Sequence, residues 1–108
     1  MEFQIIQLAD ARAERERSGR LSHEFLRVPA LSATIYELGA GSDDPQQPHA
    51  EDEIYYVVAG RAKFDVRGEQ RPVREGEFIY VAAEVPHRFV EIEEDLTLLV
   101  LFAPAKTR

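Results

Sequence analysis

Residues 41–60 read GSDDPQQPHAEDEIYYVVAG, and this stretch decides the fold. Its first part, residues 41–48, is rich in the Gly, Pro and Asp residues that form turns. Residues 54–58 are a continuous run of Ile, Tyr and Val, which favour β-strands. The pattern predicts that the chain leaves a loop and enters a sheet near His49.

A row of polar side chains marks the start of that strand. Side chains alternate between the two faces of a strand, so an extended segment that begins at residue 47 places four of them on one face. The four are Gln47, His49, Glu51 and Glu53. Neutral imidazole and carboxylate are usual protein ligands of Zn, Mn, Fe or Ni. Two interpretations stay open at this point, a metal site and a polar strand start that faces water.

A second stretch repeats the arrangement. Residues 76–91 read GEFIYVAAEVPHRFVE, which is again a turn, an apolar strand, a loop and a strand, with His87 directly after Pro86. In a small barrel, two such units can bring His49 and His87 to one cavity. This second stretch therefore favours the metal site.

The two stretches resemble the two sequence motifs of the cupins. The first motif is written G-x5-H-x-H-x3,4-E-x6-G; counted from Gly41, its further positions are Gln47, His49, Glu53 and Gly60. The second is written G-x5-P-x-G-x2-H-x3-N; counted from Gly76, its further positions are Ala82, Glu84, His87 and Glu91. All spacings fit. The departures are the first His, the Pro and Gly of the second motif, and the final Asn.

The resemblance implies an all-β fold. We expect a cupin-type antiparallel β-barrel, or double-sheet jelly roll, formed by residues 21–108. Residues 1–20 form an N-terminal arm in front of it, in which residues 10–17 are expected to make a short exposed helical turn that ends at Ser18-Gly19. Because this segment has no apolar stripe, we expect it to be solvated and mobile.

The resemblance also implies a metal centre. His49, Glu53 and His87 are the expected ligands of a divalent Fe, Mn, Ni or Zn ion, and Gln47 is a weaker fourth ligand through its amide oxygen. Two imidazoles and a carboxylate leave coordination positions open for substrate and dioxygen. Glu51 is a candidate for proton transfer beside them. The alternative is a hydrogen-bonded pair of histidines in a polar cavity without metal.

Strand alternation predicts which side chains line the pocket. The expected lining residues are Tyr55, Val57, Phe64, Phe89 and Glu91, with Phe78 or Tyr80 closing the cavity from a neighbouring strand. Each of them suits a plain barrel core equally well. A mainly apolar pocket with a few polar groups suits a small organic ligand.

The remaining strands follow from turn spacing. They are expected at residues 21–28, 31–38, 61–66, 71–74, 77–81, 87–92 and 96–102, with residues 93–95 as a polar turn before the last. His23 matches neither motif and is expected to be a surface or core residue. The run 96–102 is apolar on both faces, so its outer face must be covered. A homodimer through such a face is therefore predicted.

Composition narrows the partners and the location. The formal charge of -7 argues against nucleic acids and anionic membranes as partners. No apolar run approaches the roughly 18 residues of a membrane span, and no secretory signal is visible at the N-terminus. The sequence has no cysteine, which excludes disulfides and thiolate ligands. A cytoplasmic location is the default expectation.

The sequence is compatible with three functions. The first is a metal-dependent enzyme of the dioxygenase, isomerase or decarboxylase type that acts on a small organic molecule. The second is a barrel that binds a small molecule or metal without turning it over. The third is a degenerate dimeric barrel without metal. The missing first His and the missing Pro and Gly of the second motif favour the second and third.

Overall fold

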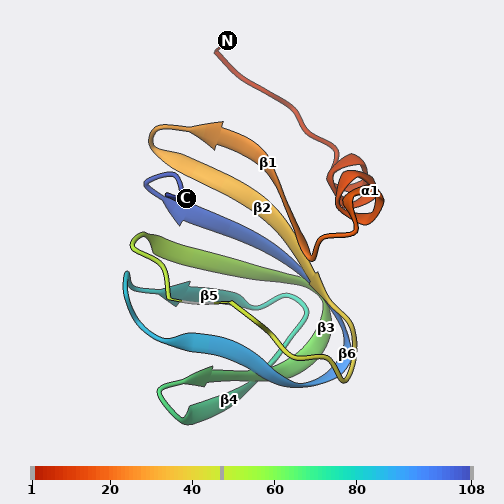
Figure 1. The fold of residues 1–108 in the computed structure, drawn as a ribbon, viewed down its shortest axis with the longest axis vertical. Helices are drawn as coiled ribbons and strands as arrows, with labels where there is room; N and C mark the ends of the chain where they lie inside the picture. Colours follow the sequence, from red (N-terminus) through yellow and green to blue (C-terminus); the bar gives the residue numbers. More distant parts are fainter. Residues whose placement is uncertain (1, 47, 108) are drawn as a thin grey trace.

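In the described part of the chain, six antiparallel strands build one strongly curved sheet (Figure 1). The computed structural model describes residues 2–46 and 48–107. Its elements are α1 (Leu8–Ser18), β1 (Ser22–Val28), β2 (Leu31–Leu38), β3 (Asp52–Val66), β4 (Glu69–Arg74), β5 (Phe78–Val81) and β6 (His87–Ala103). The strand order is β1-β2-β6-β3-β4, and β5 pairs with β3. The predicted all-β fold with a short N-terminal helical segment is confirmed.

The long strands β3 and β6 belong to both halves of the barrel. Up to Ala59, β3 pairs with the last part of β6 and with β5; from Arg61 onward, it pairs with the first part of β6 and with β4. Register shifts between Val57 and Lys63 mark the bend. The sheet therefore folds over on itself where β3 and β6 turn together, at the right of Figure 1.

Gly60 lies at the centre of this bend. Its φ is 100°, and a Cβ added there would lie 2.2 Å from the carbonyl oxygen of Asp95. The prediction of separate strands on either side of Gly60, and of a turn at residues 93–95, is wrong, because both strands continue through the bend. Bulges absorb the change of direction, so the acidic residues 93–95 stay in β6 with exposed side chains.

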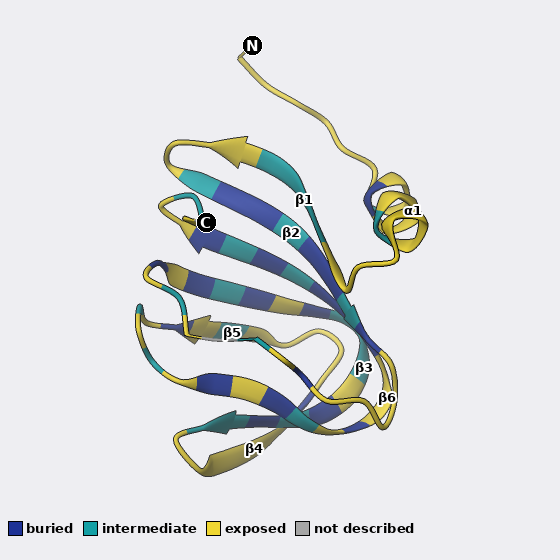
Figure 2. Ribbon diagram, viewed as in Figure 1, coloured by how far each residue is buried: buried dark blue, intermediate teal, exposed yellow. Residues whose placement is uncertain are grey.

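Alternating side chains of the two long strands fill the inside of the barrel. Tyr55 and Val57 of β3 lie opposite Val100 and Leu98 of β6, and all four are buried. The alternation of buried and exposed residues along both strands is visible in Figure 2. Burying such a side chain contributes about 1.5–3 kcal/mol. The predicted inward positions of Tyr55 and Val57 are confirmed.

Aromatic side chains gather on the outer face of the same sheet. Phe78 and Tyr80 of β5 lie opposite Tyr56 and Ile54 of β3. Phe78 is 68%, Tyr80 60% and Tyr56 40% exposed. The expectation that Phe78 or Tyr80 closes the cavity is wrong. The register turns them outward and points their neighbours Ile79 and Val81 inward.

The N-terminal helix is attached to the barrel by charge. α1 ends as predicted, at Gly19 in the left-handed conformation with a φ of 72°. It contacts β1 and β2 and buries Ala11, while most of its other residues are exposed, as expected of a solvated segment. Arg12 and Arg15 lie 3.0 and 2.8 Å from the carboxylate oxygens of Glu37 on β2. The helix docks through these ion pairs although it has no apolar stripe.

Glu37 joins α1 to the outer layer of the sheet. Its carboxylate also accepts a hydrogen bond of 2.7 Å from the hydroxyl of Thr97 on β6. Burial alone raises the pKa of Glu37, but the hydrogen bonds from Thr97, Arg15 and Arg12 outweigh it and lower the pKa overall. Glu37 is therefore ionised at neutral pH and holds both arginines.

The segment before α1 lies apart from the barrel. Residues 2–7 form no regular element and run away from the sheet (Figure 1). Phe3 and Ile5 are 75% and 85% exposed. Across the described residues, no helix has the length and apolar character needed to cross a lipid bilayer.

Candidate functional site

The two motif stretches meet at one end of the barrel. The expected strand start at residue 47 is wrong, since β3 begins at Asp52 and His49 lies in the loop before it. The carbonyl of His49 accepts a 2.7 Å hydrogen bond from the backbone N–H of Glu84, in the loop before β6. The side chain of Asp52 accepts another, of 2.9 Å, from the N–H of Ala83. These bonds hold the two loops together and bring His49 near His87.

Two departures from the cupin motif keep the backbone shape that the motif residues favour. Glu84 stands at the Gly position and has a φ of 68°. Glu91 stands at the Asn position and has a φ of 47°. Gly and Asn are the residues that adopt this left-handed region most readily. Both glutamates therefore occupy backbone positions that the motif specifies.

His87 and Glu53 form a buried pair. Nε2 of His87 lies 2.9 Å from Oε1 of Glu53, and both side chains are only 2% exposed. Nε2 also lies 3.0 Å from the hydroxyl of Tyr55, and Nδ1 lies 2.7 Å from the carbonyl oxygen of Val85. A carbonyl only accepts, so Nδ1 carries a proton and donates it to Val85. In the neutral ring, Nε2 is then the nitrogen with a free lone pair.

The ionisation of His87 depends on these neighbours. Burial alone lowers the pKa of His87. The Glu53 carboxylate and the Val85 carbonyl outweigh burial, so the pKa is raised overall. The pKa of Tyr55 is raised well above its usual value, mainly by burial and next by the nearby charge of Glu53. Tyr55 therefore stays a neutral hydroxyl beside the imidazole.

The Glu53 carboxylate is buried with His87 as its nearest polar neighbour. Its Oε1 lies 2.9 Å from Nε2 of His87, and neither oxygen has any further polar partner among the described residues. Glu53 as a whole is only 1% exposed to solvent. Buried carboxylates are normally hydrogen-bonded or paired, because desolvation of the charge is costly. This residue has lone pairs available for a ligand.

His49 faces the same site from the loop. Its ring centre lies 6.4 Å from that of His87 and 4.8 Å from that of Phe102, which it meets edge-on. Burial is the main cause that lowers the pKa of His49, with a smaller contribution from the charge of Lys106. His49 is therefore neutral at pH 7. Within residues 2–46 and 48–107, no three His, Asp or Glu side chains are arranged to hold a metal ion.

The other two predicted polar residues differ in placement. Gln47, the predicted weak fourth ligand, lies outside the described residues. Glu51 is buried and accepts two hydrogen bonds at Oε2, from the N–H and the hydroxyl of Thr107 at 3.0 and 2.8 Å. Burial raises the pKa of Glu51, but these bonds outweigh it and lower the pKa overall. A role of Glu51 in proton transfer stays a prediction.

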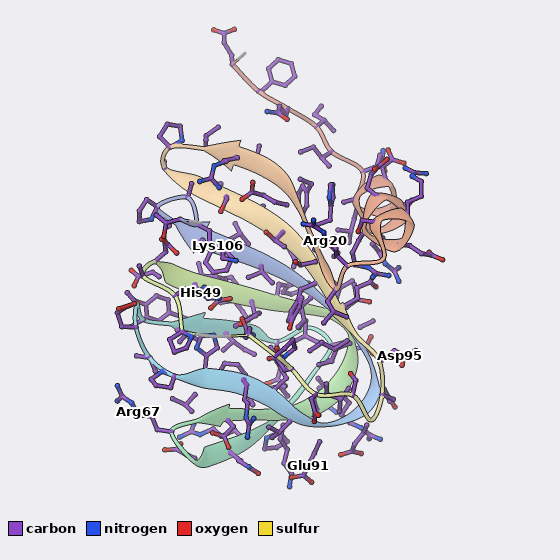
Figure 3. The ribbon with its side chains drawn as sticks, in the orientation of Figure 1. Arg20, His49, Arg67, Glu91, Asp95 and Lys106 are labelled. Carbon is purple, nitrogen blue, oxygen red and sulfur yellow. The ribbon has the colours of Figure 1, made fainter. Side chains whose placement is uncertain are left out.

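The predicted pocket residues divide into core and surface. Tyr55, Phe64 and Phe89 are buried. Tyr55 and Phe64 pack against the His87 ring, and Phe89 packs against Tyr55, with ring centres 5.0 Å apart. The prediction for Glu91 is wrong. Its positive φ turns the side chain outward, as Figure 3 shows. There its carboxylate lies 3.4 Å from Nζ of Lys63.

A cavity of about 780 Å³ opens beside His49 and Glu53. Its wall is the inner face of β1, β2 and β6, and its rim includes the α1–β1 connection and the C-terminal residues. The lining residues are Ser18, Arg20, Ser22, His23, Glu24, Arg27, Thr34, Tyr36, Gln46, His49, Glu53, Val100, Phe102, Lys106 and Thr107. It is more polar than the predicted pocket. His23, expected at the surface or in the core, lines it.

Sequence reasoning missed a buried acid next to this cavity. Asp44 comes from the turn-rich loop, yet it is 5% exposed. It accepts hydrogen bonds from the hydroxyl of Tyr36 and, at 2.9 Å, from the N–H of Phe89. Burial, and then the bond to Asp44, raise the pKa of Tyr36. The only sequence signal was an Asp in a loop, which normally indicates a turn.

The fold and the site define a small antiparallel barrel with a polar cluster of histidine and glutamate at one end of its interior. The sequence model described as the cupin domain matches residues 34–103. The chain therefore belongs to the cupin family. An uncharacterized protein of Streptomyces coelicolor is 43% identical to it over 105 residues, which are 97% of this chain and 100% of that protein.

Solved structures show the same fold. The DMSP lyase DddQ from Ruegeria pomeroyi is 27% identical with a TM-score of 0.65, over 70% of this chain and 39% of the lyase. This chain thus spans well under half of the lyase. KdgF from Halomonas sp. is 26% identical with a TM-score of 0.68, over 77% of this chain and 76% of KdgF. A Cupin 2 conserved barrel domain protein from Salinispora arenicola is 19% identical with a TM-score of 0.70. The match covers 95% of this chain and 88% of the Salinispora chain.

Proposed function

We propose that this cupin binds a divalent transition metal through His49, Glu53 and His87 and acts on a small organic molecule in the adjoining cavity. The observation that carries the proposal is the Glu53 carboxylate, buried without a hydrogen-bond partner among the described residues. A cation that takes up its lone pairs offsets the desolvation cost of this charge. The three residues also occupy the ligand positions of the motifs that the sequence resembles.

The two imidazoles have the properties of metal ligands. The Val85 carbonyl fixes the proton of His87 on Nδ1 and leaves Nε2 directed at Glu53. His49 is kept neutral by burial, so its lone pair is available at pH 7. The set of two imidazoles and one carboxylate suits Fe, Mn, Ni or Zn.

A divalent metal at such a site supplies a Lewis acid or a centre for dioxygen chemistry. The residues of the chain would bind the metal, orient the small molecule and exclude water from the site. The Tyr55 hydroxyl and the aromatic ring of Phe64 orient the His87 ring. Glu51, with its lowered pKa, accepts rather than donates a proton at neutral pH.

The fold does not choose among dioxygenase, isomerase and decarboxylase chemistry. The second candidate is a barrel that binds its ligand without turnover, and the observation that favours it is Gln47 at the place of the first motif histidine. Consumption of dioxygen or substrate with a metabolite panel separates the two. Cytoplasmic location, and the exclusion of nucleic acids and membranes as partners, stay predictions.

The metal proposal is tested by elemental analysis of the purified, untagged protein before and after mild chelation. We expect about one Fe, Mn, Ni or Zn ion per chain, and loss of the ion in His49→Ala because one of two nitrogen ligands is removed. Gln47→His restores the first motif histidine and is expected to hold the metal about 10-fold more tightly or better.

A matched control for these variants is His23→Ala, which removes an imidazole from the cavity outside the proposed ligand set. It is expected to keep the full metal content. A wild-type protein without metal, with metal appearing only in Gln47→His, would overturn the proposal and leave the barrel that binds ligands without an ion.

We also propose that a second copy of the chain covers the exposed aromatic face of Tyr56, Phe78 and Tyr80. These rings form one contiguous stripe across β3 and β5. An isologous dimer places the same stripe on both sides of the interface. Unpaired aromatic stripes of this kind are typical of interaction surfaces.

Phe78→Glu is expected to shift the protein from dimer to monomer in light scattering at micromolar concentration, because it places two carboxylates against apolar surface. The melting temperature of the monomer, measured at low protein concentration, is expected to be the same in the variant and the wild type. Phe78 packs little within the chain, so its loss hardly affects the barrel itself. A single monomeric peak from the wild type would contradict the dimer.

A further inference from the structure

The cavity beside the proposed metal ligands carries an uneven charge. The charged side chains among its described lining residues are Arg20, Glu24, Arg27, Glu53 and Lys106. The guanidinium of Arg27 lies 2.8 Å from the Glu24 carboxylate, and Glu53 lies against His87. Neither Arg20 nor Lys106 forms an ion pair with any residue that the structure describes. Arg20 and Lys106 are therefore cations without an ion-pair partner in a cavity that also contains carboxylates, in a chain whose formal charge is -7.

The C-terminal segment holds Lys106 firmly at this cavity. The N–H of Lys106 donates a 3.0 Å hydrogen bond to the hydroxyl of Ser32, which is fully buried. Its carbonyl accepts a 2.7 Å hydrogen bond from Arg27. Next to it, Thr107 donates twice to the buried Glu51. All of these bonds use the backbone of Lys106 or atoms of Thr107. The ammonium group of Lys106, which lies over the ring of Phe102, has no hydrogen-bond partner among the described residues.

The side chain of Lys106 lies close to the proposed metal ligands. Its Nζ is 5.7 Å from the ring centre of Phe102, and the same ring meets His49 edge-on at 4.8 Å. In Figure 3, Lys106 and His49 lie at the same end of the barrel, while Arg20 lies farther along, toward α1. An anionic group at Lys106 therefore places the rest of a small molecule beside His49 and Glu53.

We propose that the cavity selects a small organic anion, and that Lys106 binds its carboxylate or phosphate group. The proposal rests on the function proposed above and names the class of molecule that the site accepts. A chain with a formal charge of -7 repels anions overall, so binding one requires a local cation in a partly enclosed site. Charge-assisted hydrogen bonds from an ammonium group are strong enough to orient such a ligand.

The test is a titration followed by amide NMR of the metal-free, chelated protein. The probes are inorganic phosphate, acetate and, as a neutral control, glycerol. We expect saturable shifts of the Lys106, Thr107 and His49 amides with at least one of the two anions, and none with glycerol. Comparison of phosphate with acetate shows which head group the site prefers. Lys106→Gln is expected to weaken binding about 10-fold, and it keeps the backbone hydrogen bonds of residue 106.

The matched control is Lys63→Gln. Lys63 is the only other lysine of the sequence and pairs with Glu91 on the outer surface, so this variant is expected to bind the anions as the wild type does. Shifts that do not saturate, that spread over the surface, or that persist in Lys106→Gln overturn the inference. Metal content is measured separately. Full metal content without anion binding would contradict only the anion-binding inference. Anion binding without metal would contradict only the proposed metal centre.

Discussion

Gly60→Ala is expected to destabilise the barrel strongly. The added Cβ would lie 2.2 Å from the carbonyl oxygen and 2.8 Å from the carbonyl carbon of Asp95, and both atoms belong to the backbone of β6. Alanine must in addition adopt a φ of 100°. Steric overlap and backbone strain together are expected to lower the free energy of unfolding by about 4 kcal/mol, measured by urea denaturation.

The neighbouring hairpin supplies the control. Gly68 has a similar φ of 91°, but a Cβ added there has nothing within 4 Å. Gly68→Ala therefore isolates the backbone strain and is expected to lose only about 1 kcal/mol. Equal losses in the two variants would show that the contact between Gly60 and Asp95 does not hold the bend.

Metal-linked stability is the second large effect. Adding the ion found by elemental analysis to the chelated protein, at 100 times its dissociation constant, is expected to raise the free energy of unfolding by about 2.7 kcal/mol. Glu53→Gln is expected to abolish this increase at the same concentration. The substitution removes the negative charge that the ion would neutralise, and it keeps the size of the side chain. Thermal denaturation with and without the ion provides the measurement.

Glu51→Gln is the matched variant for that experiment. Glu51 is also a buried glutamate of the same stretch, but its carboxylate already has partners on Thr107. We expect a less stable protein that still gains stability from the ion. Loss of the gain in both variants, or in neither, would contradict the assignment of Glu53 as a ligand.

The strand pattern of the barrel was predictable because alternation and turn residues are local signals. Both strands of the first hairpin, β1 and β2, and the inward positions Tyr55 and Val57 agree with the structure. The continuity of β3 and β6 was not predictable in the same way. Gly60 and the acidic residues 93–95 indicate a turn locally, whereas a bulged strand depends on the contact between residues 60 and 95, which are distant in the sequence.

The candidate site was predictable only where motif spacing applies. Spacing brought Glu53 and His87 together, and the structure shows them in contact. The side chain of Glu91 turns outward because its φ is positive, and the residue pattern did not predict this backbone conformation. Lys106 and His23 line the cavity from the C-terminal segment and from β1, and neither lies in a motif.

The C-terminal segment has a practical consequence for handling the protein. At the rim of the cavity, Thr107 donates a hydrogen bond to Glu51, and Lys106 donates one to Ser32. A polyhistidine tag fused to this end would place extra imidazoles beside His49 and compete for any ion or anion bound there. The N-terminal segment leads away from the barrel, as Figure 1 shows. A cleavable tag therefore belongs at the N-terminus, where purification leaves the chemistry of the cavity unaltered.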